Sequence, residues 1–173
     1  MKKFLMISLV ATTLFANLKS FGQEDKSKRP SPPAKVSATT STGNVITIDY
    51  SQPSVKGRTI GKEIATYGKV WRTGANEATV FQISKDAKID GKYSLKAGKY
   101  GLYSIPGEKN WTIIFNKTWN QWGTEYKEGE DALRVVVDTK KAPQMMEKMT
   151  FQISKDGTVL LLWGDKSVSF TVK

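Results

Sequence analysis

The segment Val70 to Thr79, VWRTGANEAT, concentrates polar side chains of the kinds that bind ligands or move protons. Arg72 supplies a planar guanidinium fork that suits a carboxylate or a phosphate. Asn76 supplies an amide that both donates and accepts hydrogen bonds, and Glu77 could act as a base, a ligand or an ion-pair partner. The alternative is a structural loop in which Trp71 anchors inward and Arg72 pairs with Glu77. The sequence favours this alternative slightly.

A second group follows in the segment Asn110 to Asp131, where Lys117, Gln121 and Trp122 lie beyond an expected strand. An exposed tryptophan beside amide side chains is typical of sugar binding, because the ring packs on a pyranose face and the amides bond its hydroxyls. An equally favoured alternative is that Trp119 and Trp122 pack back over the open end of the sandwich. If the two loops meet, the predicted ligand site comprises Arg72, Asn76, Glu77, Lys117, Gln121 and Trp122.

The chain contains no cysteine and no histidine. Thiol nucleophiles, histidine bases, Ser-His-Asp triads and the ordinary zinc sites are therefore excluded. An enzyme would have to use carboxylates or lysine, with Glu77 as the best candidate for a base and Arg72 or Lys117 stabilising negative charge. No catalytic motif, metal site or cofactor motif is recognisable, so the sequence favours a role without catalysis.

Apolar and polar residues alternate along most of the chain, in segments such as NVITIDY, TVFQIS, NWTIIFNK and SVSFTV. This period of two indicates strands with one buried face, and short turns rich in Gly, Pro and Asp separate them. One such turn is expected at 164–166. We expect an all-β domain, an antiparallel β-sandwich or jelly roll of about ten short strands. The only helical candidate is APQMMEKM, at 142–149.

The first 22 residues begin with two lysines after Met1, followed by a short apolar run and small residues before Gln23, a pattern typical of a secretory signal peptide. The apolar run of 13 residues is shorter than the roughly 20 that a spanning helix needs. Residues 23–35 are polar with several prolines, so we expect a disordered linker there and a single domain over 36–173. We therefore expect an exported protein, periplasmic or secreted, with no transmembrane segment in its mature form.

Removing residues 1–22 leaves 24 basic and 16 acidic residues, a net charge of +8. Most of the lysines are scattered through turns, which is typical of a solvated surface. Nucleic-acid binding would require clustered basic and aromatic residues, so no nucleic-acid partner is expected. Affinity for an acidic polymer or an anionic envelope surface stays open.

Four segments, YGKVWRTGANEAT, LKAGKYGLYSIPGEKNWTIIFNK, NQWG and ALRVVV, resemble the DUF2911 family, a group of exported proteins common in Bacteroidota. The similarity runs from about Thr59 to Val172, and WRTGANEAT is its most specific motif. The resemblance implies an exported β-sandwich and supplies no reaction, because the function of the family is unknown. One departure is Thr66, where the family usually has a proline. The family-defining positions that the resemblance implies are Trp71, Arg72, Gly74, Asn76, Glu77, Asn116, Lys117, Gln121, Trp122, Gly123 and Arg134.

Three functions follow from these residues. The first is a ligand-binding domain for a glycan or another cell-envelope component. The second is a hydrolase of the carboxylate or lysine type, which requires a concave pocket that holds Glu77 beside a second carboxylate or a buried lysine. The third is a structural or interaction module, which predicts no polar pocket.

Overall fold

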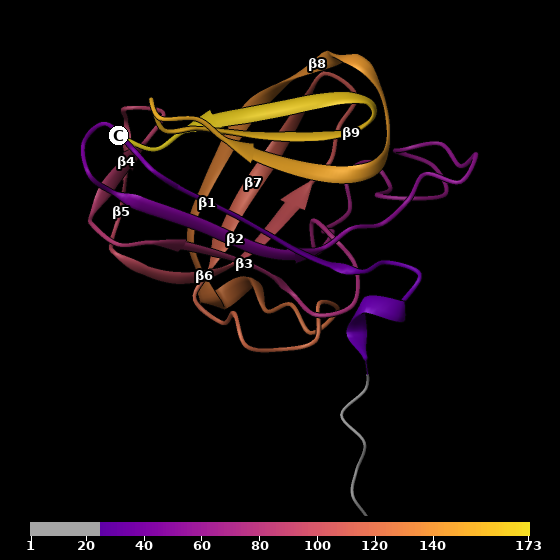
Figure 1. Ribbon diagram of the computed structural model, residues 1–173, viewed down its shortest axis with the longest axis horizontal. Helices are drawn as coiled ribbons and strands as arrows, with labels where there is room; N and C mark the ends of the chain where they lie inside the picture. The colour runs from indigo at the N-terminus through magenta and orange to yellow at the C-terminus, as the bar shows by residue number, and fades with distance from the viewer. Residues whose placement is uncertain (1–24) are drawn as a thin grey trace, which may run out of the picture.

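The structure is a computed structural model and describes residues 25–173 (Figure 1). Seven strands form one antiparallel sheet in the order β1-β2-β3-β6-β7-β8-β9, and β4 and β5 form a separate two-stranded sheet. The strands are β1 (Pro33–Thr39), β2 (Val45–Ser51), β3 (Thr79–Ile83), β4 (Ala87–Ile89), β5 (Tyr93–Leu95), β6 (Gly98–Ile105), β7 (Asn110–Asn116), β8 (Asp131–Ile153) and β9 (Thr158–Thr171); the 3₁₀ turns are η1 (Lys26–Lys28) and η2 (Glu128–Glu130).

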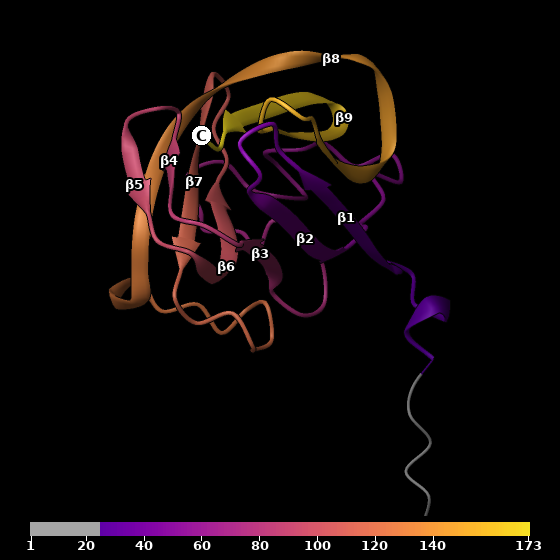
Figure 2. The same ribbon diagram turned by 60° about the vertical axis from the view of Figure 1, so that its left-hand side comes forward.

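The prediction of an all-β, sandwich-like fold is confirmed, but two of the strands are long. The first part of β8 pairs with β7, and the rest pairs with β9 across two register shifts. The strand therefore arches over the top of the molecule and carries β9 back across the sheet (Figure 2). Near the end of β8, Met149 N donates to Pro53 O at 3.0 Å, so the curled sheet nearly closes on the segment after β2.

Two local expectations differ from this structure. Residues 142–149, the helical candidate, lie within β8, where the pairing with β9 shifts register on both sides of Met146, so the helical prediction is wrong. The turn expected at 164–166 is absent, because β9 continues through this segment. Gly164 adopts a φ of 57°, a left-handed conformation that lets the strand bend without ending.

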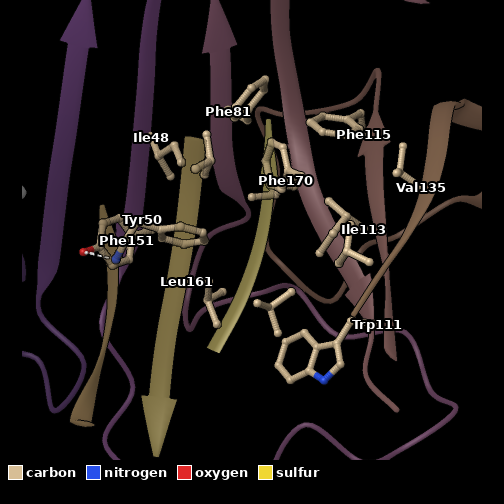
Figure 3. Packing of buried hydrophobic residues seen from close by; sticks show 14 of the residues in the cluster. Ile48, Tyr50, Phe81, Trp111, Ile113, Phe115, Val135, Phe151, Leu161 and Phe170 are labelled. Carbon is tan, nitrogen blue, oxygen red and sulfur yellow. Dashed lines mark hydrogen bonds between the residues drawn. The ribbon is translucent and has the colours of Figure 1, made fainter. Parts of the chain in front are cut away.

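The hydrophobic core lies between the sheet and the strand β9 that folds over it (Figure 3). Alternation puts Ile46 and Ile48 of β2 fully inside, as the sequence predicted. The rings of Phe81, Phe115 and Phe170 meet edge to face with centroids 5.1–5.9 Å apart, which joins β3, β7 and β9. A chain without disulfides depends on such burial for its stability.

Regular structure is present before the predicted domain boundary at residue 36. Residues 23–35 were expected to be a disordered linker, yet η1 forms at 26–28 and β1 begins at Pro33. The physical reason is that this segment pairs with β2 and bonds the 70–78 loop: Asn76 Nδ2 donates to Ser31 O at 3.0 Å. The expected signal peptide, residues 1–22, lies outside the described residues. In residues 25–173 no helix is long and apolar enough to cross a membrane.

Strand order brings the two motif loops together. Both β3 and β7 run antiparallel to β6, so they run parallel to each other. The register places the start of β3 at Thr79 opposite Leu102, and the end of β7 at Asn116 opposite the adjacent Gly101. Because the two strands are staggered, the loop that enters β3 and the loop that leaves β7 meet beside the middle of β6.

Candidate functional site

Trp71 fixes the first motif loop to the core, which confirms its predicted role as an anchor. Its backbone forms a bridge with Ser104 of β6, with hydrogen bonds of 2.7 and 2.9 Å. Its ring stacks on Trp163 at a centroid distance of 5.1 Å and meets Trp111 edge to face at 5.9 Å. The residue that follows, Arg72, is therefore held at a defined place on the rim of the core.

The rest of this loop is tightly folded. Thr73 and Asn76 adopt φ values of 47° and 60°, in the left-handed region that only glycine enters without cost. Buried hydrogen bonds hold this geometry: Thr73 Oγ1 donates to Ser104 Oγ at 2.9 Å, and Thr79 Oγ1 donates to Thr73 O at 2.8 Å. Asn76 is thus a turn residue whose amide NH₂ is already bonded to Ser31.

The two loops pair through their backbones. Ala78 N donates to Gln121 O at 3.1 Å, Gly123 N donates to Asn76 O at 3.0 Å, and Glu77 lies directly opposite Trp122. We call this pairing of residues 76–78 with 121–123 the crossing. It brings Glu77 and Trp122 side by side, so the two motif loops do meet, as the shared-site prediction requires.

The crossing has two faces, and the candidate residues are divided between them. Residues directly opposite each other in an antiparallel pair present their side chains to the same face. Glu77 and the exposed Trp122 therefore share one face. On the other face Gln121 Nε2 donates to Tyr103 Oη at 2.9 Å, and Gly123 lies against Arg72. Lys117 is exposed and lines none of the described cavities near the crossing.

A cavity of about 380 Å³ opens on the Arg72 face, and we call it the Arg72 cavity. Its size lies within the range of small-molecule sites. Its walls include three aromatic residues, one from each motif loop and one from β6. The lining residues are Val70, Trp71, Arg72, Tyr103, Gly123, Thr124 and Tyr126.

Arg72 differs from the other three arginines of the chain. Arg29 is bonded to Glu77, Arg58 donates to backbone carbonyls of Ser54 and Val55, and Arg134 is bonded to Asp131. Arg72 has no hydrogen bond or ion pair to any residue in the range 25–173, and its Nε is buried. Among the described residues, four buried side-chain polar atoms lack a partner: Nε of Arg72, Nε1 of Trp111 and Trp163, and Oγ1 of Thr139. Of these four, Arg72 alone is a charged residue, and it lines the Arg72 cavity, so it is the best candidate for an absent partner.

A polar network holds the far wall of the cavity in place. Tyr126 Oη donates to Asp131 at 2.7 Å, and Arg134 donates to both at 2.8–2.9 Å. Asn116 Nδ2 donates to Asp131 Oδ1 and to the backbone of Lys127. Burial and the hydrogen bond to Asp131 raise the pKa of Tyr126 to about 12. Asn116 and Arg134 therefore shape the loop and do not face a ligand.

Sequence reasoning missed Tyr103, Thr124 and Tyr126. Tyr103 is fully buried in β6, where Leu102 and Tyr103 are both buried and the alternation that marks a single inward face is lost. That departure from period two is the signal that could have revealed a second covered face of the sheet.

The predicted Arg72–Glu77 ion pair is wrong, because Glu77 faces the opposite side of the crossing. Its carboxylate accepts hydrogen bonds from Lys26 at 2.8 Å and from Arg29 at 2.9 Å, both in the N-terminal segment. These residues line a cavity of about 390 Å³ together with Asp49. Burial alone would raise the pKa of Glu77, but the hydrogen bonds outweigh it and lower the pKa to about 2. The cavity thus meets the pocket condition for the hydrolase, since it holds Glu77 together with Asp49. The low pKa and the two bonded cations make Glu77 a weak base at neutral pH, which disfavours that function.

The hydrogen bonds from Lys26 and Arg29 to Glu77, which we call the Glu77 clamp, predict that the free energy of unfolding depends on pH. Since the pKa of Glu77 is about 2 in the folded state and 4.5 as its reference value, its contribution is present above about pH 4.5 and is lost as the pH falls towards 2. The side chain is 39% exposed, so after discounting for screening we expect a contribution of about 1 kcal/mol. Glu77→Gln should reduce the difference in urea stability between pH 6 and pH 2.5 by that amount.

The matched control is Glu108→Gln, an exposed carboxylate without a hydrogen bond to the described residues. It should leave the pH dependence as in the wild type. Equal pH profiles for wild type and Glu77→Gln would contradict the clamp.

Comparison with known proteins gives one result. The family described as "Protein of unknown function (DUF2911)" matches residues 31–172, which is nearly the whole described chain. No curated protein and no solved structure matches this chain. The match agrees with the resemblance of the motifs and supplies no activity, so the function has to be argued from the site.

Proposed function

The chain belongs to the DUF2911 family, whose function is unknown, and we propose that it is an exported domain that binds a ligand in the Arg72 cavity. The ligand class is a glycan or another component of the cell envelope. The location, periplasmic or secreted, rests on the signal-like pattern of residues 1–22.

One observation carries this proposal: Arg72 presents an unpartnered guanidinium to a cavity that is otherwise walled by rings. Arg72 is partly buried, and its Nε is buried without a hydrogen bond, which costs free energy that a sequence selected only for stability would avoid. Its retention beside Trp71 and Tyr103 is explained if a ligand completes the hydrogen bonds. A structural module, by contrast, predicts no polar pocket.

The chemistry of the walls supports a sugar. Aromatic rings stack on the C–H face of a pyranose, and Trp71, Tyr103 and Tyr126 supply three rings around one cavity. Thr124 adds a hydroxyl at the exposed side. Trp122, the sugar platform expected from the sequence, is 46% exposed but faces away from this cavity.

Blocking the cavity tests the proposal. Thr124 is exposed and lines the cavity, so Thr124→Trp should fill it without burying a polar group or lowering the Tm. We expect binding of envelope glycans to the mature protein, followed by calorimetry or on a glycan array, to fall at least about 10-fold, since steric occlusion removes most ring contacts.

Asn120→Trp is the matched control, because Asn120 is exposed in the same loop but does not line the cavity. It should bind like the wild type. A loss of binding in Trp122→Ala with none in Thr124→Trp would place the ligand on the other face of the crossing and overturn the proposal.

A further inference from the structure

We infer that the group recognised in the Arg72 cavity is a carboxylate, as carried by an acidic sugar. This inference rests on the proposed function and specifies the chemistry of its ligand. It depends on the charges that line the cavity and on two hydrogen-bond donors that lack acceptors in residues 25–173, on Arg72 and Tyr103.

The charge of the cavity fits a single negative charge. Arg72 is the only cation among the lining residues, and none of them is acidic. A guanidinium fork matches the two oxygens of a carboxylate in a planar, bidentate geometry. A phosphate monoester carries nearly two charges at neutral pH, and one arginine would leave about half of that charge uncompensated in a partly buried site.

Tyr103 supplies a second donor. Its hydroxyl accepts a hydrogen bond from Gln121 Nε2 at 2.9 Å, and its own proton has no acceptor in the described residues. Tyr103 is fully buried while the cavity is empty, so this donor serves a ligand only if the hydroxyl becomes accessible when the ligand enters, with Gln121 holding the oxygen. Burial raises the pKa of Tyr103, and the opposing effects of the Gln121 hydrogen bond and the Arg72 charge do not reverse this, so the proton stays on.

Gln121 is therefore a positioning residue. Its Nε2 donates to Tyr103 Oη, which then acts as the acceptor in this hydrogen bond. The hydroxyl proton of Tyr103 must therefore point away from Gln121. The other tyrosine of the cavity cannot serve in this way, because Tyr126 Oη already donates to Asp131. Tyr126 contributes its ring, which lies 4.9 Å from the ring of Tyr103.

One carboxylate of the protein lies near the cavity. Glu125 is exposed, yet its charge raises the pKa of Tyr103, which places it within electrostatic range of that hydroxyl. It forms no ion pair with Arg72 in the structure. A free carboxylate that enters the cavity would therefore meet repulsion from Glu125 as well as attraction from Arg72.

The experiment compares three sugars that share a ring: glucuronic acid, glucose and glucose 6-phosphate, titrated into the mature protein by NMR or calorimetry. We expect glucuronic acid to bind at least about 10-fold more tightly than glucose, since a charge-assisted pair is lost with the neutral sugar. Glucose 6-phosphate should bind more weakly than glucuronic acid. A dipeptide with a free carboxylate, acetyl-alanyl-alanine, should bind more weakly than the acidic sugar.

Variants test the two donors separately. Tyr103→Phe and Gln121→Leu should each reduce the preference for glucuronic acid over glucose by about 5- to 10-fold, whereas a purely structural role would weaken both sugars equally. Thermal unfolding shows whether each variant is folded under the conditions used. Glu125→Gln should strengthen the binding of glucuronic acid by about 2- to 3-fold, because it removes a like charge.

The outcomes separate this inference from the proposed function. If glucose and glucuronic acid bind equally and Thr124→Trp blocks both, the cavity binds a ligand but the carboxylate inference is wrong. Tighter binding of glucose 6-phosphate or of the dipeptide also overturns it. If no envelope glycan and none of these probes bind, both proposals fail.

Discussion

Replacing Arg72 with methionine is expected to make the protein more stable and unable to bind its ligand. Methionine keeps an unbranched stem against Gly123 and removes the guanidinium group, whose Nε is buried without a hydrogen bond. Replacing buried charged groups with apolar ones of similar size is often neutral or stabilising. We expect a gain of about 1 kcal/mol, or roughly 3 °C in Tm, with a loss of at least about 100-fold in affinity for glucuronic acid.

The opposite signs of the two effects make this variant informative. A residue that served the fold would lose stability on substitution, whereas a residue retained for binding would lose only affinity. Arg58→Met is the matched control, because its guanidinium donates to the carbonyls of Ser54 and Val55, outside the cavity. It should leave affinity unchanged. A destabilised Arg72→Met that binds normally would show that Arg72 is structural.

Adding one methyl group at Gly123 is expected to have the second large effect. A Cβ at this position would lie 2.2 Å from Arg72 Cδ and 2.8 Å from the carbonyl oxygen of Asn76. The arginine stem could move, but the backbone carbonyl belongs to the crossing itself. We expect Gly123→Ala to cost about 2–3 kcal/mol in urea unfolding and to abolish ligand binding, since Arg72 is displaced.

Gly129→Ala provides the comparison for this variant. Gly129 lies in η2 of the same loop, and a Cβ there would meet nothing within 4 Å. Its stability should stay within about 0.5 kcal/mol of the wild type. If both glycine variants behave alike, the close approach of Gly123 to Arg72 has no energetic importance.

The fold could be predicted from the sequence where apolar and polar residues alternate strictly. The prediction failed where strand pairing with residues distant in the sequence decides the local structure. β2 and the first half of β7 follow the apolar-polar period, and their inward faces match the sequence; from Ile113 to Asn116 β7 is buried on both faces. Residues 142–149 contain methionine, glutamate and lysine, which favour a helix locally. They form part of β8 because β9 pairs along them and Met149 is fully buried, and such tertiary pairing overrides local propensity.

The site was predictable in part for a similar reason. The sequence placed Arg72 and Glu77 five positions apart in one loop, which suggested that they pair. Their division between two faces depends on the antiparallel pairing of residues 76–78 with 121–123, which the sequence does not encode locally. The partners of Glu77, Lys26 and Arg29, are 51 and 48 positions away in a segment predicted to be disordered. Tyr103 was missed because β6 is buried on both faces, so its sequence shows no alternation that would mark Tyr103 as facing a cavity.

The most direct measurement follows the side-chain Nε–H signals of the arginines by NMR while glucuronic acid is added. Four such signals exist in the chain, from Arg29, Arg58, Arg72 and Arg134. If the Arg72 cavity binds a carboxylate, the Arg72 signal shifts with saturation and the other three stay in place, because their partners are within the protein. Binding of glucuronic acid with an unmoved Arg72 signal would contradict the account.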